Sequence, residues 1–133
     1  MKAVFADTSY YLALVNPADQ HHGAACQWTS GIAGTSVTTA WVIAELANAM
    51  SKIANRPFFL SLLRDLQTDR RVTIVPPNKD VFDSGLDLYS RRSDKDWSLT
   101  DCISFVVMND RGLSKALTAD HHFEQAGFKA LLR

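Results

Sequence analysis

The chain has 133 residues, of which 47% are hydrophobic and 21% are charged. This length fits a single domain, residues 1–133, whose core needs no disulfide, and the composition excludes an intrinsically disordered chain. The 14 basic side chains balance 14 acidic ones, so the formal net charge is zero. Zero net charge removes the overall basic character that favours nucleic-acid binding, but it leaves room for an acidic pocket with a basic rim.

Two features of the sequence are typical of a cytoplasmic protein. Cys26 and Cys102 lie far apart, and neither belongs to a CxxC motif, as is common in a reducing compartment. No signal-peptide pattern is present, and no window approaches the ~18–20 apolar residues that span a bilayer. We therefore expect a protein of the cytoplasm that has no membrane partner.

Short apolar runs alternate with longer helical patterns along the chain. In order, we expect a strand at 3–6, a helix at 8–15, a helix from 19 to about 28, a loop at 31–34, a strand at 36–38 and a helix from about 40 to 53. The second half continues with a helix at 58–67, a strand at 72–75, helices at 79–92 and 98–111, a strand at 116–119, a short helix ending at 127 and a strand at 128–132. Prolines at 17, 57, 76 and 77 mark breaks between these elements.

This alternation predicts how the elements pack. Strands that alternate with helices pair in parallel through right-handed crossovers. We therefore expect an α/β fold, a three-layer α/β/α sandwich around a four- to five-stranded parallel sheet. In such folds ligands bind beyond the carboxyl ends of the strands, near the point where the strand order reverses.

Four acidic residues fall near that edge of the predicted sheet. Asp7 directly follows the first predicted strand, and Asp120 directly follows the fourth. Asp101 lies in the first turn of the helix predicted from residue 98, and Glu45 lies about one turn into the helix that follows the second strand. The sequence therefore predicts that four carboxylates, distant along the chain, meet at one edge of the sheet.

Each aspartate also fits a purely structural role. An Asp at the start of a helix is a common N-cap, and Asp101 with Ser98 forms a pattern close to a capping box. Glu45 is harder to explain in this way, because apolar neighbours disfavour an unpaired carboxylate. The nearest cation on its own predicted helix, Lys52, lies seven positions further along.

The four acids together indicate a metal site. Two unit charges ~4 Å apart repel by about 4 kcal/mol at an effective dielectric constant near 20. A cluster of four carboxylates is therefore untenable unless some protonate or a cation lies between them. Oxygen ligands favour Mg²⁺ or Mn²⁺ over zinc, and such sites commonly serve phosphate chemistry.

Four segments carry a resemblance to a known family: VFADTS at 4–9, EL at 45–46, DKDWSLTDC at 94–102 and LTADHHF at 117–123. With these motifs in this order, the sequence resembles the PIN-domain ribonucleases. Within that family it is most similar to the VapC-type toxins of bacterial toxin–antitoxin pairs. The resemblance spans essentially the whole chain, and WSLTDC is its most specific part.

The resemblance implies a PIN-like fold and a Mg²⁺- or Mn²⁺-dependent endoribonuclease that inhibits translation. The acidic quartet of the family, both catalytic and metal-binding, is matched by Asp7, Glu45, Asp101 and Asp120. The hydroxyl positions that flank the acids are matched by Thr8, Ser98 and Thr100, to which we assign substrate-positioning roles. The family also implies a homodimer and a small VapB-like antitoxin that inserts basic residues into the acidic pocket.

Several further residues have two interpretations. The pairs His21-His22 and His121-His122 fit no zinc spacing, and the second pair is placed to act on a leaving group, contact phosphate or simply pack. Trp41 and Trp97 fit either stacking on unpaired bases or packing, and Asp96 fits either an auxiliary acid or a solvated loop charge. Candidate phosphate contacts are Arg70, Arg71, Arg91, Arg92, Lys95, Arg111 and Lys115.

Two other functions remain open at this point. The pocket of a catalytically silent binding module would dock basic side chains of a partner. A different metal-dependent phosphohydrolase would use the same acids on a phosphomonoester. Ser9 occupies the place where an aspartyl-phosphate mechanism needs a second acid, which argues against one version of that alternative.

Overall fold

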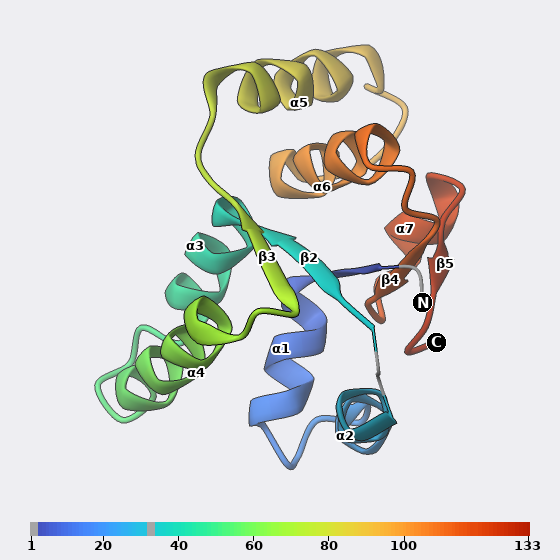
Figure 1. The fold of residues 1–133 in the computed structure, drawn as a ribbon. Helices are drawn as coiled ribbons and strands as arrows, with labels where there is room; N and C mark the ends of the chain where they lie inside the picture. Colours follow the sequence, from blue (N-terminus) through green and yellow to red (C-terminus); the bar gives the residue numbers. More distant parts are fainter. Residues whose placement is uncertain (1–2, 32–33) are drawn as a thin grey trace.

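The structure, a computed structural model, describes residues 3–31 and 34–133, so residues 32–33 of the expected loop lie outside the described part. Five parallel strands form one sheet in the order β3-β2-β1-β4-β5 (Figure 1). The strands are β1 (Val4–Ala6), β2 (Ser36–Thr39), β3 (Val72–Val75), β4 (Lys115–Leu117) and β5 (Lys129–Ala130). The predicted α/β fold with a parallel sheet is confirmed.

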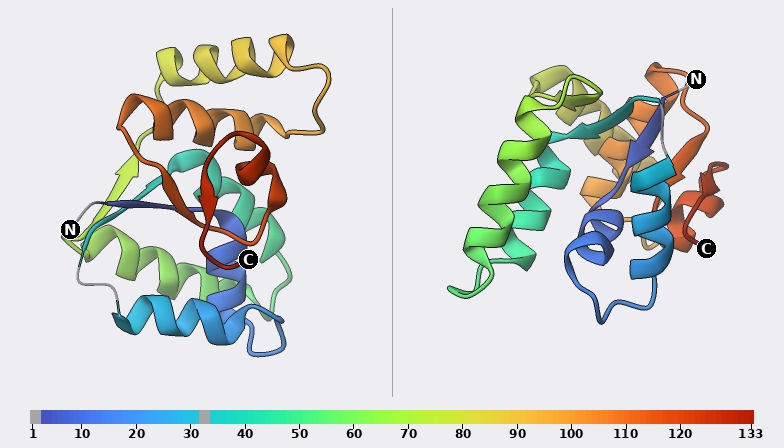
Figure 2. Two further views of the ribbon diagram at one scale, coloured as in Figure 1. Left: turned by 90° about the vertical axis from the view of Figure 1, so that its right-hand side faces the viewer. Right: turned by 60° about the horizontal axis from the view of Figure 1, so that its bottom comes forward.

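Helices lie on both faces of this sheet. They are α1 (Thr8–Val15), α2 (His22–Gly31), α3 (Ala40–Ala49), α4 (Arg56–Thr68), α5 (Lys79–Arg91), α6 (Leu99–Asp110) and α7 (His121–Gln125). Helices α5 and α6 lie on one side of the sheet, and α1, α2 and α4 lie on the other (Figures 1 and 2). Right-handed crossovers explain this separation, because β1 to β3 progress across the sheet in one direction and β4 and β5 in the other. The three predicted layers are therefore present.

The strand order reverses at β1. This strand pairs with β2 on one side, where Phe5 lies opposite Val37, and with β4 on the other, where Phe5 lies opposite Ala116. The connections that leave β1 and β4 depart to opposite faces of the sheet, which opens a crevice at their carboxyl ends. Any ligand site of this fold is expected there.

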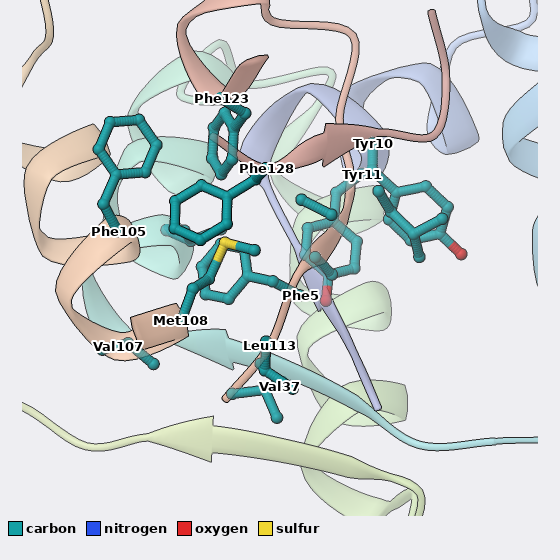
Figure 3. Close-up of a cluster of buried hydrophobic side chains, with 14 of the residues drawn as sticks. Phe5, Tyr10, Tyr11, Val37, Phe105, Val107, Met108, Leu113, Phe123 and Phe128 are labelled. Atoms are coloured by element: carbon teal, nitrogen blue, oxygen red, sulfur yellow. The ribbon is translucent and has the colours of Figure 1, made fainter. Parts of the chain in front are cut away.

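A cluster of aromatic rings fills the core on the α6 side of the sheet (Figure 3). The ring of Phe105 on α6 meets the rings of Phe123 and Phe128 at centroid distances of 4.9 and 5.6 Å. Phe5, which is fully buried on the central strand, lies 6.2 Å from Phe123. Because α6 and α7 each contribute a ring to this cluster, packing fixes where both helices begin, next to the crevice.

Helices α5 and α6 approach each other closely at Gly85. This glycine is buried, and a Cβ atom added to it would lie 2.3 Å from Cγ1 and 3.2 Å from Cα of Ile103 on α6. Only a residue without a side chain allows that approach. Gly85 therefore helps to position α6, whose first turn carries Asp101.

The predicted helix at 40–53 is too long. Helix α3 ends at Ala49, where the amide of Met50 bonds to the carbonyls of Ala47 and Leu46. Residues 53–55 form a turn, and Ile53 is 89% exposed. The run continues in good helix formers, but no tertiary contact buries its apolar residue, so propensity alone does not extend the helix.

The fourth predicted strand, 116–119, is displaced toward the N-terminus. Strand β4 ends at Leu117, and the next residues leave the ladder because the hydroxyl of Thr118 accepts the amide of Asp120 at 3.1 Å. A side chain that binds nearby backbone competes with the sheet in this way. The other boundaries agree within about two residues with those expected, except that α2 lies three residues further along the chain and β5 is only Lys129–Ala130. Among the described residues, no helix has the length and apolar character to cross a membrane.

Candidate metal centre

The four predicted acids line one cavity of about 360 Å³ at the carboxyl edge of the sheet. Asp7 follows β1, Glu45 lies on α3, Asp101 lies in the first turn of α6, and Asp120 precedes α7. The described residues that line this cavity are Asp7, Thr8, Ser9, Leu12, Glu45, Asp96, Ser98, Asp101, Asp120 and His122. The fold thus brings together carboxylates from four different elements at the point where the strand order reverses.

Asp7 lies deepest in the cavity, with 4% of its surface exposed. Its Oδ2 atom accepts hydrogen bonds from the hydroxyls of Thr118, at 2.8 Å, and Ser9, at 3.2 Å. The pKa of Asp7 is raised to about 6, mainly by burial and also by the charges of Asp101 and Glu45, while the Thr118 hydroxyl acts in the opposite direction. Both hydroxyls bind the same oxygen, so the other oxygen of this carboxylate remains available to a ligand.

The two hydroxyls also join the ends of β1 and β4. Ser9 Oγ accepts the amide of Ala119 at 3.1 Å, and Thr118 Oγ1 accepts the amide of Asp120 at 3.1 Å. Since each hydroxyl accepts from backbone, its proton is free to be donated to Asp7. Ser9 and Thr118 therefore orient Asp7 and Asp120 at once, a role that the sequence analysis did not assign to them.

Asp101 fulfils the structural role expected of it and still lines the cavity. Its amide donates to Ser98 Oγ at 3.0 Å, and its Oδ2 accepts the amide of Ser98 at 3.3 Å, which completes a capping box. Burial raises the pKa of Asp101, as does the neighbouring charge of Asp120, while the Ser98 amide and His122 act in the opposite direction. The capping interaction holds the carboxylate at the mouth of the crevice.

Asp120 likewise combines a cap with a place in the cavity. Its Oδ1 accepts the amide of His122 at 2.9 Å, as an N-cap of α7. The imidazole Nδ1 of His122 lies 3.2 Å from Oδ2 of Asp101 and 3.4 Å from Oδ1 of Asp120. His122 therefore bridges two of the acids, and sequence reasoning had assigned it no definite role.

Glu45 is half-buried on α3, and the ion pairs found among the described residues include none to it. Lys52, the nearest cation along the sequence, lies beyond the end of α3 and is therefore not on the helix that carries Glu45. Nor does any Lys or Arg of the described chain line the cavity. Inside the cavity, the four acids therefore meet no Lys or Arg of the described chain, and His122 is the basic side chain that lines it.

The hydroxyl residues expected beside the acids differ in their placement. Thr8 and Ser98 line the cavity, whereas Thr100 is not among the described lining residues. The Oγ1 atom of Thr8 is buried and has no hydrogen-bond partner in the described part of the chain. An orphaned hydroxyl beside oxygen-only acids fits a hard divalent cation with its retained waters, since that ligand supplies the missing partner.

Of the remaining candidates, Asp96 lines the cavity, whereas the two tryptophans and the candidate phosphate contacts are not among its described lining residues. Trp97 is buried, donates its indole N–H to Gln125 at 3.0 Å and packs edge-on against Phe105, so the packing interpretation is correct for it. Trp41 stacks on Phe82 at a centroid distance of 6.3 Å. Among the candidate phosphate contacts, three arginines form ion pairs with nearby aspartates: Arg71 with Asp69, Arg91 with Asp87 and Arg92 with Asp94.

A parallel sheet with an acidic crevice at its switch point defines a class of α/β domains built to bind a divalent cation. Comparison with known families identifies the particular one. The chain belongs to the PIN domain family, whose profile matches residues 4–129. The resemblance inferred from the four motifs is therefore confirmed.

Individual relatives agree with this assignment. The chain is 28% identical over 126 residues to the 23S rRNA-specific endonuclease VapC20 of Mycobacterium tuberculosis, a match that covers 94% of this chain and 95% of that protein. The crystal structure of M. tuberculosis VapC20, described as a sarcin-ricin loop cleaving toxin, superposes with a TM-score of 0.85 at 23% identity over 94% of this chain and 95% of that one. VapBC2 from Rickettsia felis, bound to a promoter DNA fragment, gives a TM-score of 0.68 at 13% identity and 97% coverage of both chains.

Proposed function

We propose that this protein is a Mg²⁺- or Mn²⁺-dependent endoribonuclease and the toxin of a type II toxin–antitoxin pair. The single observation that supports this most strongly is the cavity in which Asp7, Glu45, Asp101 and Asp120 meet without a lining Lys or Arg. The relationship to an rRNA-specific endonuclease supports RNA as the substrate and translation as the process that is inhibited, in the cytoplasm.

The cation would be held by Asp7, Glu45 and Asp101, with Asp120 completing the site or forming a second one. When bound, it lowers the pKa of a water that attacks phosphorus and offsets the charge on the leaving oxygen. Thr118 and Ser9 keep one oxygen of Asp7 occupied, so the other is directed to the ion in a single orientation. Pre-orientation of this kind limits the reorganisation needed during the reaction.

A groove beside the cavity offers a path for the RNA strand. It has a volume of about 1010 Å³ and shares Asp96 and Ser98 with the acidic cavity. Lys95 lines this groove, and the ion pairs of the described residues include none that neutralises it. Tyr89, which is 52% exposed, lines it as well. We assign a phosphate contact to Lys95 and a stacking contact with an unpaired base to Tyr89.

Replacement of single acids tests the proposed catalysis. Asp7→Asn and Asp101→Asn keep the shape of the side chain and one acceptor oxygen, but they remove the charge that holds the cation. We expect each to abolish Mg²⁺-dependent cleavage of a ribosomal RNA fragment while the far-UV circular dichroism spectrum is unchanged. Asp110→Asn is the matched control, because Asp110 is an exposed acid at the other end of α6. If Asp7→Asn and Asp101→Asn both cleave RNA at the rate of the parent, the proposal is wrong.

The same charge supports the proposed protein partner. A cavity with four acids and no lining Lys or Arg is complementary to an extended segment that carries Arg or Lys. We propose that a small antitoxin inserts such a segment and displaces the substrate, and that the toxin is a homodimer. Exposed apolar residues on α4, Phe58 at 66% and Leu60 at 57%, are available for an interface. Sequencing of the adjacent reading frame tests the first point, and ultracentrifugation tests the second.

A catalytically silent binding module predicts a different result in one titration. Under the proposed function, Mn²⁺ added to the purified protein releases or absorbs heat with saturable binding, and RNA cleavage appears over the same concentration range. A silent module gives neither the binding isotherm nor cleavage, and a phosphomonoesterase would hydrolyse a simple phosphomonoester in preference to structured RNA.

A further inference from the structure

The side of the cavity formed by α7 differs in chemistry from the side formed by Asp7 and Glu45. Asp120, His121 and His122 each offer one donor atom, and these three atoms lie within 4.8 Å of one another. Asp120 and His122 line the cavity, and His121 lies beside them outside the described lining. Two of the three donors are imidazole nitrogens, while the opposite side of the cavity offers oxygen alone. The cavity is therefore not a uniform carboxylate site.

The geometry around Asp120 is unusual for hydrogen bonding alone. Both histidines direct Nδ1 toward the same atom, Oδ1 of Asp120, from 3.7 Å for His121 and 3.4 Å for His122. Oδ1 already accepts the backbone amide of His122 at 2.9 Å. The 3.7 Å separation exceeds hydrogen-bond length, so a hydrogen bond accounts for at most one of the two approaches.

A shared metal ion accounts for these separations directly. Two ligands that are each about 2.1 Å from one ion lie about 3.0 Å apart at a right angle and about 3.4 Å apart at the tetrahedral angle. Nδ1 of His122 lies 3.2 Å from Oδ2 of Asp101 and 3.4 Å from Oδ1 of Asp120. These distances match that range before any movement, and the slightly longer one to His121 needs only a small rotation of an exposed side chain.

We propose that Asp120, His121 and His122, with Asp101 as a shared ligand, form a second metal site that takes a transition ion, Mn²⁺ or Zn²⁺, in preference to Mg²⁺. Imidazole binds Mn²⁺ and more strongly Zn²⁺, whereas Mg²⁺ takes oxygen ligands almost exclusively. The inference rests on the proposed function only for the first ion, held by Asp7, Glu45 and Asp101. The ion of the first site and the transition ion of the second site would then lie on either side of Asp101.

Magnetic resonance of bound Mn²⁺ tests the nitrogen ligands without any measurement of activity. The purified full chain is loaded with Mn²⁺, and electron spin echo envelope modulation detects ¹⁴N nuclei bound to the ion. We expect nitrogen modulation in the parent and its loss in the double variant His121→Asn, His122→Asn. The matched control is His21→Asn, which alters the other histidine pair. It should keep the full modulation.

Competition binding provides the second measurement. Removal of His121 and His122 should weaken Zn²⁺ binding by more than the roughly 10- to 100-fold that loss of a supporting residue costs. His121→Asn, which changes a side chain outside the described lining, should leave Mg²⁺ binding unchanged. His121→Asn alone guards against misfolding of the double variant, because the His121 side chain is 58% exposed. This single variant should weaken Zn²⁺ binding in the same direction.

Three results would overturn the proposal. Absence of nitrogen modulation at saturating Mn²⁺ would leave the histidines as hydrogen-bond donors only. Unchanged Zn²⁺ affinity in the double variant would also show that the two histidines are not metal ligands. Loss of Zn²⁺ binding in Cys26→Ser would place the ion at the other histidine pair, since Sγ of Cys26 lies 3.5 Å from Nε2 of His22. These failures leave Mg²⁺-dependent cleavage intact, whereas failure of the proposed function removes both Mg²⁺ binding and cleavage.

Discussion

Replacement of Asp7 by asparagine should stabilise the protein in the absence of metal and abolish its stabilisation by metal. The pKa of Asp7 is raised from 3.8 to about 6, mainly by burial. Because the folded state binds this proton more tightly than the unfolded state does, the parent loses stability as the pH rises through the interval from 3.8 to 6. Above about pH 6 this loss of stability is complete and no longer changes with pH.

The size of the effect follows from the difference between the two pKa values. A difference of about two units corresponds to about 3 kcal/mol, since one unit is about 1.4 kcal/mol. Asparagine carries no charge to desolvate, and its amide oxygen still accepts the hydroxyls of Thr118 and Ser9. Asp7→Asn should therefore raise the free energy of unfolding at pH 7.5 by up to about 3 kcal/mol, or raise the melting temperature by roughly 10 °C.

Thermal unfolding with a chelator present measures this difference. The advantage of Asp7→Asn should be largest above pH 6 and should shrink steadily toward pH 4, where the parent carboxyl is protonated in the folded state. Saturating Mg²⁺ should make the parent more stable than Asp7→Asn, because only the parent retains the carboxylate that binds the ion. A variant that is less stable than the parent by the same amount at pH 7.5 and pH 4 would refute the reasoning, because the effect would then not arise from ionisation.

Three further changes test other parts of the account. Gly85→Ala should lower the free energy of unfolding by about 1–3 kcal/mol, measured in urea, because the added Cβ meets Ile103 at 2.3 Å. Thr118→Val removes a hydrogen bond to Asp7 and should shift the midpoint of Mg²⁺ binding to higher pH, whereas Thr118→Ser should restore it. Lys95→Gln should raise KM for RNA with kcat nearly unchanged. It should also reduce, by about one, the slope of the logarithm of the binding constant against the logarithm of the salt concentration, which we call the salt slope.

Matched variants make these results specific. Gly23→Ala should be neutral or stabilising, because Gly23 is exposed on α2 and an added Cβ meets nothing within 4 Å. Lys129→Gln changes an exposed lysine on β5 that does not line the groove, and it should leave the salt slope as it was. Equal destabilisation by both glycine variants, or equal slopes for both lysine variants, would contradict the account.

The acidic cavity could be predicted because each acid is tied to an element that the sequence defines. Asp7 and Asp120 follow strands recognised from short apolar runs, and parallel strands end at one edge. Glu45 stands out because an acid among apolar neighbours needs a ligand. A capping pattern does not exclude a residue from a functional site. Asp101 shows this, because its carboxylate completes the capping box of α6 and also lines the cavity.

The hydroxyls that orient the acids could not be predicted. Ser9 and Thr118 are 109 positions apart, and only the pairing of β1 with β4 brings their hydroxyls to 3.0 Å from each other. Ser and Thr occur in many loops, where their hydroxyls bond to local backbone, so neither position carries a distinctive signal. The nearest hint is spacing, because Ser9 lies two residues after Asp7 and Thr118 two residues before Asp120.

Helix ends depend on contacts that a sequence pattern does not contain. The apolar and helix-forming run after Ala40 continues past Met50, yet α3 stops at Ala49; Met50 is still buried, but Ile53 beyond it is 89% exposed and has no packing to extend the helix. The same limitation applies to Thr100, which follows the cavity-lining Ser98 by two positions but is not among the described lining residues. Positions two apart at the start of a helix face different directions.

The central claim is that carboxylates from four elements share a divalent cation, and anomalous X-ray scattering from Mn²⁺-soaked crystals tests it most directly. The account predicts a strong anomalous peak within bonding distance of Asp7 and Asp101, and its loss in crystals of Asp7→Asn. A map without a peak between these two carboxylates, at Mn²⁺ concentrations that support RNA cleavage, would contradict it.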